Sequence, residues 1–330
     1  MRGGEKNAIE ICSVRTRVQW KCFHALPRRV QSPAAEWVPP LRLQMRQMWA
    51  PKNPFFRHAS AAAWLARRNG EAVGRISAQV DRLDAECGRP GTGHFGQLEA
   101  IDDPAVFRNL LAAAERWLID RGMSEVTGPF DLSINQQCGL LVEGFEHSPM
   151  MMMGYNPPWY PRQLEALGFE PAVETLAYRG SPRHELPAQV ERLLARMQGR
   201  LDIKPVPRAR LAAHAEQMRQ IFNAAWAENW GFVPFTEAEF ANMVDEMKLL
   251  VRPGYVNIAE IDGELAGFIV ALPDLNELIA DLDGRLFPLG AVRLLWRIAR
   301  KHGRRARIPL MGVLPKYQHS LTGAAISYAL

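Results

Sequence analysis

The chain has 330 residues, of which 48% are hydrophobic and 23% charged, the composition of an ordinary globular protein. It lacks an apolar run near the roughly 18 residues that cross a bilayer and an N-terminal segment typical of a secretory signal, and its four cysteines show no CxxC spacing. Transmembrane, fibrous, disordered, disulfide-framework and zinc-site classes are therefore disfavoured, and we expect a cytoplasmic protein without a bound metal.

The net charge of +5 is concentrated near the end of the chain. Residues 284–330 contain nine lysines and arginines and no acidic residue, whereas the preceding residues contain 31 basic and 35 acidic ones. A local basic excess predicts a local anionic partner, such as phosphate groups or a membrane surface. We do not expect nucleic-acid binding, because the basic segment lacks interleaved stacking aromatics and a recognisable module.

The first half of the sequence predicts a mixed α/β domain. Helices are expected before residue 48 and at 157–167, and strands at 9–14, 61–67, 72–80, 94–100, 126–130 and, as a closing pair, 168–179. Asn69-Gly70, between two of these strands, is a strong hairpin signal. Asp103 and Pro104 predict the start of a helix whose apolar residues recur at spacings of three and four and which ends at Gly122.

The second half repeats this order after a connecting segment. Strands are expected at 201–206, 255–261, 265–272 and 307–313, and helices at 209–228, 236–250 and from about 323. We therefore predict two α/β domains with mixed (α+β) sheets, at residues 1–180 and 200–330, joined by a linker at 181–199. The chain ends at Leu330, only a turn or two into the last helix. This predicts either a truncated product, the interpretation we favour, or a sheet completed in another way.

Three stretches of the sequence carry a family resemblance. They are GPFDLSIN at 128–135 followed by CGLLVEGF at 138–145, NWGFVPFT at 229–236, and LPDLN at 272–276. Together with the order of strands and helices, they resemble a bacterial family of tandem proteins with the GNAT acyl-CoA N-acyltransferase fold, similar to the bacterial ceramide synthases. The resemblance implies transfer of an acyl group from acyl-CoA to an amine, with a long-chain sphingoid base as the suggested acceptor. It implies acyl-CoA as co-substrate and no permanently bound cofactor.

The resemblance also implies where CoA would be held. In this fold, backbone groups of a central strand bond the pantetheine arm, and a loop at the start of the next helix offers N–H groups to the pyrophosphate. In the second copy this implies the cofactor-binding set Met311, Gly312, Val313, Gln318, Thr322, Gly323 and Ala324. Leu321 replaces the family's interior glycine, so the segment is either a phosphate cradle or an ordinary strand-to-helix loop. The corresponding loop of the first copy, 100–104, has two carboxylates and no glycine, and we expect it not to bind CoA.

Amide formation needs a base for the amine and often an acid for the leaving thiolate. The resemblance implies a tyrosine on the late helix, but Leu164 stands at its position and Tyr160 lies one turn earlier. The carboxylate candidates are Glu228, Glu237 and Asp274, each of which is also interpretable as an ordinary solvated carboxylate. The candidates for substrate binding are Asn135, Asn156, Asn229, Trp230 and Asn276, of which Asn135 is equally interpretable as a turn former. The missing tyrosine and the degenerate loop favour an alternative from another class, a non-catalytic protein that binds acyl-CoA or a lipid surface.

An insertion at residues 284–306 predicts an extra basic amphipathic helix. Arg293, Arg297, Arg300 and Arg304 fall on one stripe at a periodicity of 3.6 residues, with a tryptophan at its border. This pattern is typical of a helix on a membrane surface, which would suit a lipid acceptor and a peripheral position on the inner membrane face. A solvated basic face on a packed helix is an equally good interpretation.

Overall fold

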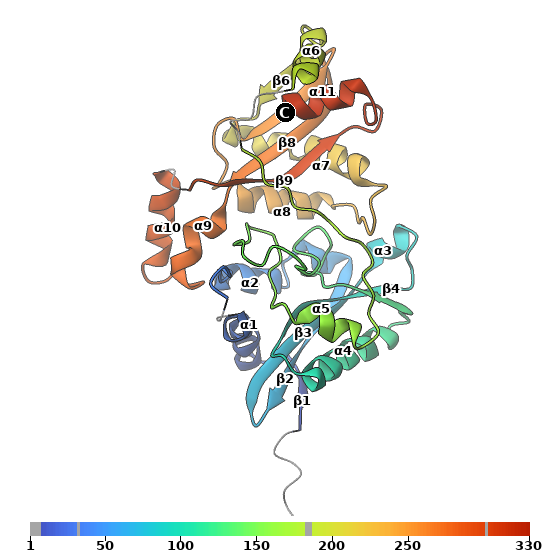
Figure 1. Ribbon diagram of the computed structural model, residues 1–330, viewed down its shortest axis with the longest axis vertical. Coiled ribbons are helices and arrows are strands. Elements are labelled where there is room, and N and C mark those ends of the chain that lie inside the picture. Colours follow the sequence, from blue (N-terminus) through green and yellow to red (C-terminus); the bar gives the residue numbers. More distant parts are fainter. Residues whose placement is uncertain (1–7, 32–33, 182–186, 301–302) are drawn as a thin grey trace, which may run out of the picture. The chain divides into compact units, whose positions relative to one another are not determined.

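The computed structural model describes residues 8–31, 34–181, 187–300 and 303–330. The chain divides into two compact units, each with its own sheet (Figure 1). Unit 1 comprises Met1–Glu170 and Leu275–His302, and unit 2 comprises Pro171–Asp274 and Gly303–Leu330. A segment from the second half of the sequence therefore belongs to the first unit.

Unit 1 is built on a five-stranded sheet of order β1-β2-β3-β4-β5, antiparallel except for the parallel pair β4–β5. Its strands are β1 (Glu10–Ser13), β2 (Ala59–Arg68), β3 (Glu71–Asp81), β4 (Thr92–Ala100) and β5 (Glu125–Thr127). Its helices are α1 (Arg17–Gln31), α2 (Arg42–Met48), α3 (Arg82–Glu86), α4 (Pro104–Ile119), α5 (Tyr160–Glu165), α9 (Leu275–Ile279) and α10 (Gly290–Ala299), with short 3-10 turns at Pro54–Arg57 and Ala280–Leu282. The predicted mixed α/β class is confirmed.

The β2–β3 hairpin and helix α4 form the centre of unit 1. Asn69 and Gly70 have φ angles of 52° and 81°, the left-handed conformation that a two-residue hairpin turn requires, as the sequence predicts. Helix α4 is N-capped by the predicted Asp103. Its apolar face packs on β3 so closely that a Cβ on Gly74 would lie 2.7 Å from the side chain of Leu110.

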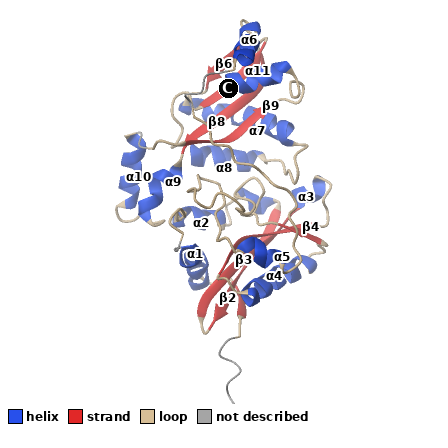
Figure 2. Cartoon of the chain, in the orientation of Figure 1, coloured by secondary structure: helices blue, strands red, loops and turns tan. Residues whose placement is uncertain are grey.

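Unit 2 is built on a four-stranded antiparallel sheet of order β6-β7-β8-β9 (Figure 2). Its strands are β6 (Leu201–Pro205), β7 (Val256–Ile261), β8 (Glu264–Pro273) and β9 (Ala306–Val313), and its helices are α6 (Ala188–Arg196), α7 (Leu211–Trp226), α8 (Glu237–Met247) and α11 (Leu321–Ala329), with a 3-10 turn at Arg208–Arg210. Successive residues of β8 face opposite layers. A Cβ on Gly267 would lie 3.1 Å from Ile326 of α11, whereas Phe268 lies on the side of α7 with Ile221.

The insertion between β8 and β9 packs within unit 1, although the sequence analysis placed it in the second domain. Leu278, Ile279, Leu282 and Leu294 of the insertion form one buried cluster with Leu41 of the first half. Polar contacts support the cluster: Arg28 pairs with Asp283, the N–H of Arg42 donates to the carbonyl of Gly284 at 3.0 Å, and the Asn276 amide donates to the carbonyl of Pro149 at 2.9 Å. Burial of these apolar side chains therefore places residues 275–300 in unit 1, although β8 and β9, which flank them in sequence, belong to unit 2.

The two ends of the insertion meet in unit 2. Asp274 is fully buried at the end of β8, and its carboxylate accepts a hydrogen bond from the Arg305 guanidinium at 2.6 Å. The N–H of Asp274 also donates to the carbonyl of Arg305 at 3.0 Å. This clamp holds the exit and the re-entry of the chain side by side, directly before β9 begins at Ala306.

Two predicted elements differ from the structure. The predicted strand pair at 168–179 is wrong, because this segment of the described chain is extended and unpaired, with Leu176 and Tyr178 exposed. Such a pair needs a sheet edge to bond with, and β5 ends after three residues. The predicted basic helix is also shorter, since α10 ends at Ala299, before Gly303 adopts a left-handed φ of 108°.

Replacing Asp274 tests whether the clamp is structural. In Asp274→Asn the buried charge is lost and Arg305 is left without its carboxylate, so we expect the unfolding free energy of unit 2 to fall by about 2 kcal/mol or more. Urea unfolding followed by circular dichroism measures the loss. The matched control is Glu264→Gln, which breaks an exposed pair with Lys316 and should cost well under about 1 kcal/mol. Equal losses in the two variants would contradict a buried clamp.

Candidate functional site

The strand-to-helix connection between β9 and α11 forms the candidate site in unit 2. β9 is the last strand of its sheet, so one of its edges carries no neighbouring strand among the described residues. The loop 314–320 leads from it to α11, which is N-capped by Ser320: its hydroxyl accepts from the N–H of Gly323 at 3.1 Å. Gln318 and Gly323, two of the residues predicted to bind the cofactor, therefore lie in the loop and the first helical turn that follow an edge strand.

The free edge of β9 presents two of the three residues expected to bond pantetheine. The Met311 carbonyl accepts from the Trp226 indole N–H at 2.8 Å, and the Val313 carbonyl accepts from the Gln318 amide at 2.8 Å. In an antiparallel strand the N–H and C=O of one residue point to the same edge. The N–H groups of Met311 and Val313 therefore face the free edge, whereas Gly312 pairs with Phe268 of β8.

Gln318 and Gly323 give the loop its shape. The Gln318 amide donates to the carbonyls of Val313 and, at 3.1 Å, Ala225 of α7, and so ties the loop to the strand and to the helix beneath it. A Cβ on Gly323 would overlap the carbonyl oxygen of Tyr317, so only glycine allows this close backbone approach. Gln318 therefore anchors the loop, and Gly323 allows its backbone to turn tightly.

The first turn of α11 offers unpaired donors. Within the described chain, the N–H groups of Leu321 and Thr322 have no hydrogen-bond acceptor, as is usual for the first turn of a helix. The Leu321 side chain, which replaces the interior glycine, is 70% exposed and points away from the core. Together with the positive end of the helix dipole, these donors suit an anion.

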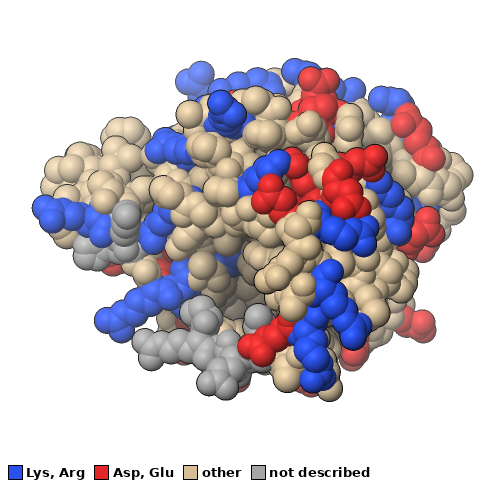
Figure 3. Space-filling view, turned by 90° about the horizontal axis from the view of Figure 1, so that it is seen from above, with Lys and Arg blue, Asp and Glu red and all other residues tan. Residues whose placement is uncertain are grey.

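Exposed charges near this loop are paired. Lys316 of the loop pairs with Glu264 at 2.8 Å. On the face of the molecule shown in Figure 3, basic and acidic side chains are interspersed. An anion at this loop would therefore be held by backbone N–H groups more than by Lys316, whose charge is already paired.

The turn after α7 brings three further predicted residues close to this edge. Trp226, which bonds Met311, is followed by exposed Glu228, Asn229 and Trp230, and the N–H of Asn229 donates to the carbonyl of Trp226 at 2.9 Å. Glu228 has no hydrogen-bond or ion-pair partner among the described residues. The three predicted residues thus follow directly on Trp226, the residue of this turn that bonds β9, whereas the carboxylate of Asp274 is buried in its pair with Arg305.

The predicted site residues of unit 1 are held by the fold itself. Tyr160 is buried, and its hydroxyl donates to Glu99 at 3.1 Å and accepts from the N–H of Ala100 at 2.8 Å. Asn156 is also buried and bonds both the N–H and the carbonyl of Leu141, at 2.7 and 3.3 Å. These side chains brace the sheet and the long irregular loop that follows β5.

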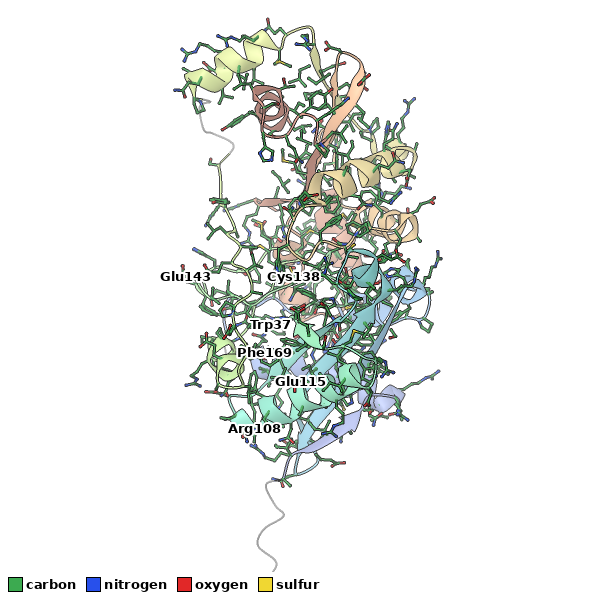
Figure 4. The ribbon with its side chains drawn as sticks, turned by 90° about the vertical axis from the view of Figure 1, so that its right-hand side faces the viewer. Trp37, Arg108, Glu115, Cys138, Glu143 and Phe169 are labelled. Atoms are coloured by element: carbon green, nitrogen blue, oxygen red, sulfur yellow. The ribbon has the colours of Figure 1, made fainter. Side chains whose placement is uncertain are left out.

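That loop also contains the half-buried Asn135, whose N–H donates to the Ser133 hydroxyl at 3.2 Å, the local bond of a turn former. Figure 4 shows Cys138 and Glu143 on the same loop. The amide of Asn276 binds the carbonyl of Pro149 near the end of the loop. The side chains of Asn156 and Asn276 therefore bond backbone groups, and Asn135 takes part in a local turn.

The first copy lacks room for a cofactor at the corresponding strand. β4 has a bulge at Gln97, whose φ is 45°, but the chain after β5 lies against β4: the N–H of Phe130 donates to the carbonyl of Phe95 at 2.9 Å. A Cβ on Gly96 would overlap the Phe130 backbone. The following loop keeps its two carboxylates, Asp102 and Asp103, in ion pairs with arginines. This geometry supports the expectation that the first copy does not bind CoA.

Comparisons with known proteins agree with the resemblance seen in the sequence. No protein-family model matches the chain. "Protein YghO" of Escherichia coli (strain K12) is 44% identical over 94% of this chain and 80% of its own length. "Bacterial ceramide synthase" of Caulobacter vibrioides is 41% identical over 97% of this chain and 84% of its own length. The chain belongs to this family of bacterial tandem GNAT-like proteins.

Among solved structures, a tandem GNAT protein from the clavulanic acid biosynthesis pathway is similar to this family member at 14% identity, with a TM-score of 0.48 over 98% of this chain and 84% of that one. No described helix is both long and apolar enough to cross a membrane. Within the described residues, no group of three or more His, Cys, Asp and Glu side chains is placed to hold a metal ion.

Sequence reasoning missed a buried polar cluster in unit 1 of this tandem GNAT-like chain. Arg75 of β3 lies 3.8 Å from Glu99 of β4, and Glu99 accepts from Gln31 at 3.1 Å and from Tyr160. Burial raises the pKa of Glu99 to about 7, against the opposing effect of Arg75, and burial raises the pKa of Asp131 to about 6. The available signal was a charged residue inside each of two predicted strands, Arg75 within β3 and Glu99 one residue before the end of β4.

The raised pKa of Glu99 predicts a pH-dependent stability. Unfolded Glu99 ionises near its ordinary pKa of 4.5 but folded Glu99 only near 7, so the folded state binds more protons between these values. Its contribution to stability is therefore most favourable below about pH 4.5, falls as the pH rises to about 7 and is constant above. The total change is about 3 kcal/mol at most.

Glu99→Gln removes this titration. We expect wild type to lose stability relative to Glu99→Gln between pH 4.5 and 7 in urea unfolding of both proteins, while the contributions of other groups largely cancel. Glu10→Gln, the same change at an exposed position of β1, is the matched control. A difference between wild type and Glu99→Gln that stays constant with pH would show that Glu99 is ionised in the folded protein throughout this range.

Proposed function

We propose that this chain is an N-acyltransferase that moves an acyl group from acyl-CoA to an amine, with a long-chain sphingoid base as the acceptor we favour. The observation that carries the proposal is the edge of β9 followed directly by the donor-rich start of α11. The relative named bacterial ceramide synthase supports acyl transfer and suggests the acceptor. Because acyl-CoA is a cytoplasmic metabolite, the proposal implies a cytoplasmic enzyme.

In this proposal unit 2 holds the co-substrate. The N–H groups of Met311 and Val313 would bond the pantetheine amides, and the first turn of α11, including Thr322, Gly323 and Ala324, would face the pyrophosphate. Gln318 would act by keeping the loop in place, since its amide already bonds two carbonyls. Unit 1 would serve as a structural partner without a second cofactor.

The reaction requires removal of one proton from the acceptor. The amine nitrogen attacks the thioester carbonyl, a C–N bond forms, the C–S bond breaks, and CoA leaves as a thiolate that takes up a proton. We assign the base to Glu228, because its exposed carboxylate lies two residues beyond Trp226, which contacts β9. The exposed Asn229 and Trp230 beside it are our candidates for acceptor binding. The burial of Asp274 and Tyr160 favours structural roles for both side chains.

A second candidate function is non-catalytic binding of acyl-CoA. It is favoured by the carbonyls of Met311 and Val313, which already bond side chains of the protein, and by Lys316, which is paired with Glu264. A binding protein would be stabilised by CoA in a thermal-shift measurement without turning over any substrate.

The activity is tested by incubating the full chain with sphinganine and acyl-CoAs of several chain lengths. We expect release of free CoA thiol, together with an N-acyl product of the matching mass in mass spectrometry. Stabilisation by CoA without release would support the binding function instead. Neither stabilisation nor release at any chain length would contradict both candidate functions.

Gly323→Ala tests the loop. The added methyl group would overlap the Tyr317 carbonyl, so the loop must shift and the N–H groups of the helix start must move with it. We expect the KM for acyl-CoA to rise at least about tenfold, the cost of one well-placed charge-assisted hydrogen bond. Gly180→Ala is the control, because a Cβ there meets no atom within 4 Å. An unchanged KM in Gly323→Ala would exclude this loop from the cofactor site.

A further inference from the structure

Helix α10 buries only one narrow side. Leu294 is 8% exposed and packs with Leu41, Leu278 and Leu282, and Ile298, one turn later, contacts the same cluster. Positions three and four apart share a face of a helix, so these two residues define the side that faces unit 1. Arg297 also reaches this side, since its guanidinium donates to the carbonyl of Leu278 at 2.6 Å.

A strip of large apolar side chains covers much of the opposite side. We call it the α10 strip, and it consists of Phe287, Leu289, Val292, Leu295 and Trp296, whose side chains are exposed by 79, 69, 65, 52 and 52%. At about 100° per residue, the four strip residues at or after 289 fall within an arc of about 120°. Five such residues in ten positions differ from the scattered exposed apolar residues of an ordinary surface.

Arginines border this strip. Arg293 and Arg297 both bond Asp281, at 3.0 and 2.8 Å, so two cations share one carboxylate. The Arg300 guanidinium lies 5.9 Å from the centre of the Trp296 ring, at the end of the helix. The border therefore keeps an excess of positive charge. Arg304, the fourth arginine of the predicted stripe, lies beyond the end of α10 and belongs to unit 2.

We propose that the α10 strip docks on an anionic lipid surface, with its apolar side chains entering the boundary of the acyl chains and the bordering arginines contacting phosphate headgroups. The sequence predicts membrane contact through the arginine stripe of an amphipathic helix with a bordering tryptophan. The exposed strip assigns the main contact to insertion of apolar side chains, and the arginines give selectivity for anionic lipids. Trp296, beside Arg300, has the amphipathic ring that is enriched at membrane interfaces.

The size and charge of the strip favour a lipid surface over a second copy of the chain. One face of a ten-residue helix offers a few hundred Å², less than the about 800 Å² that each partner of a stable dimer buries. Its arginine border would also repel the same border of a second copy, whereas anionic headgroups complement it.

Vesicle co-sedimentation tests the proposal. The full chain is mixed with vesicles of equal parts phosphatidylglycerol and phosphatidylcholine, and with phosphatidylcholine vesicles alone, without any acyl-CoA or amine. We expect binding to the anionic vesicles that weakens, but persists, at high salt. Leu295→Glu should bind at least about tenfold more weakly, because one buried apolar side chain is worth that factor or more. Since no substrate is present, the outcome is independent of the proposed acyl transfer.

The matched control is Ile119→Glu, which makes a similar change at a 67% exposed position of α4 and should bind like wild type. Quenching of tryptophan fluorescence by brominated lipids gives a second measurement, in which Trp296→Phe should lose part of the quenching without losing binding. Absence of wild-type binding, or equal binding by Leu295→Glu, would overturn the proposal. So would a dimer in light scattering that Leu295→Glu dissociates while vesicles remain unbound.

Discussion

A buried carboxylate needs a counter-charge. In this protein the pair of Asp274 and Arg305 meets that requirement and fixes the path of the chain in its second half. Asp274 ends β8 with no exposure, and Arg305 supplies both a guanidinium to its side chain and a carbonyl to its N–H. The clamp fixes where the chain leaves unit 2 and where it returns. Because β9 begins at the next residue after Arg305, its pairing with β8 and its free edge, and hence the loop that leads into α11, depend on this contact.

The two copies show how similar frameworks acquire different chemistry. In unit 2 the residues at the start of α11 carry no charge, and Gly323 lets two stretches of backbone approach each other. In unit 1 the corresponding helix start carries Asp102 and Asp103, and the Phe130 backbone occupies the space over Gly96. In our proposal, a strand, loop and helix in the same order therefore suit an anion in unit 2 but not in unit 1.

The α10 helix illustrates the limit of a periodic pattern. The arginine spacing correctly indicates a helix with a basic side, but periodicity does not determine which side packs inward. The residues that the helix packs against determine it: Leu294 is buried against Leu41, Leu278 and Leu282, and the α10 strip is left exposed. The buried pair of Arg75 and Glu99 is a similar case, since both residues are visible in sequence but their contact joins two strands.

The sequence alone determined the features that depend on neighbouring residues: the Asn69-Gly70 turn, the Asp103 cap, the order of strands and helices, and the family to which the chain belongs. These follow from backbone geometry and local spacing. Only the tertiary structure decided that residues 275–302 join unit 1, that Asp274 and Tyr160 are buried, and that the segment 168–179 finds no strand to pair with. Burial and strand pairing depend on groups that are far apart in the chain. A local sequence pattern does not show which of these groups come into contact.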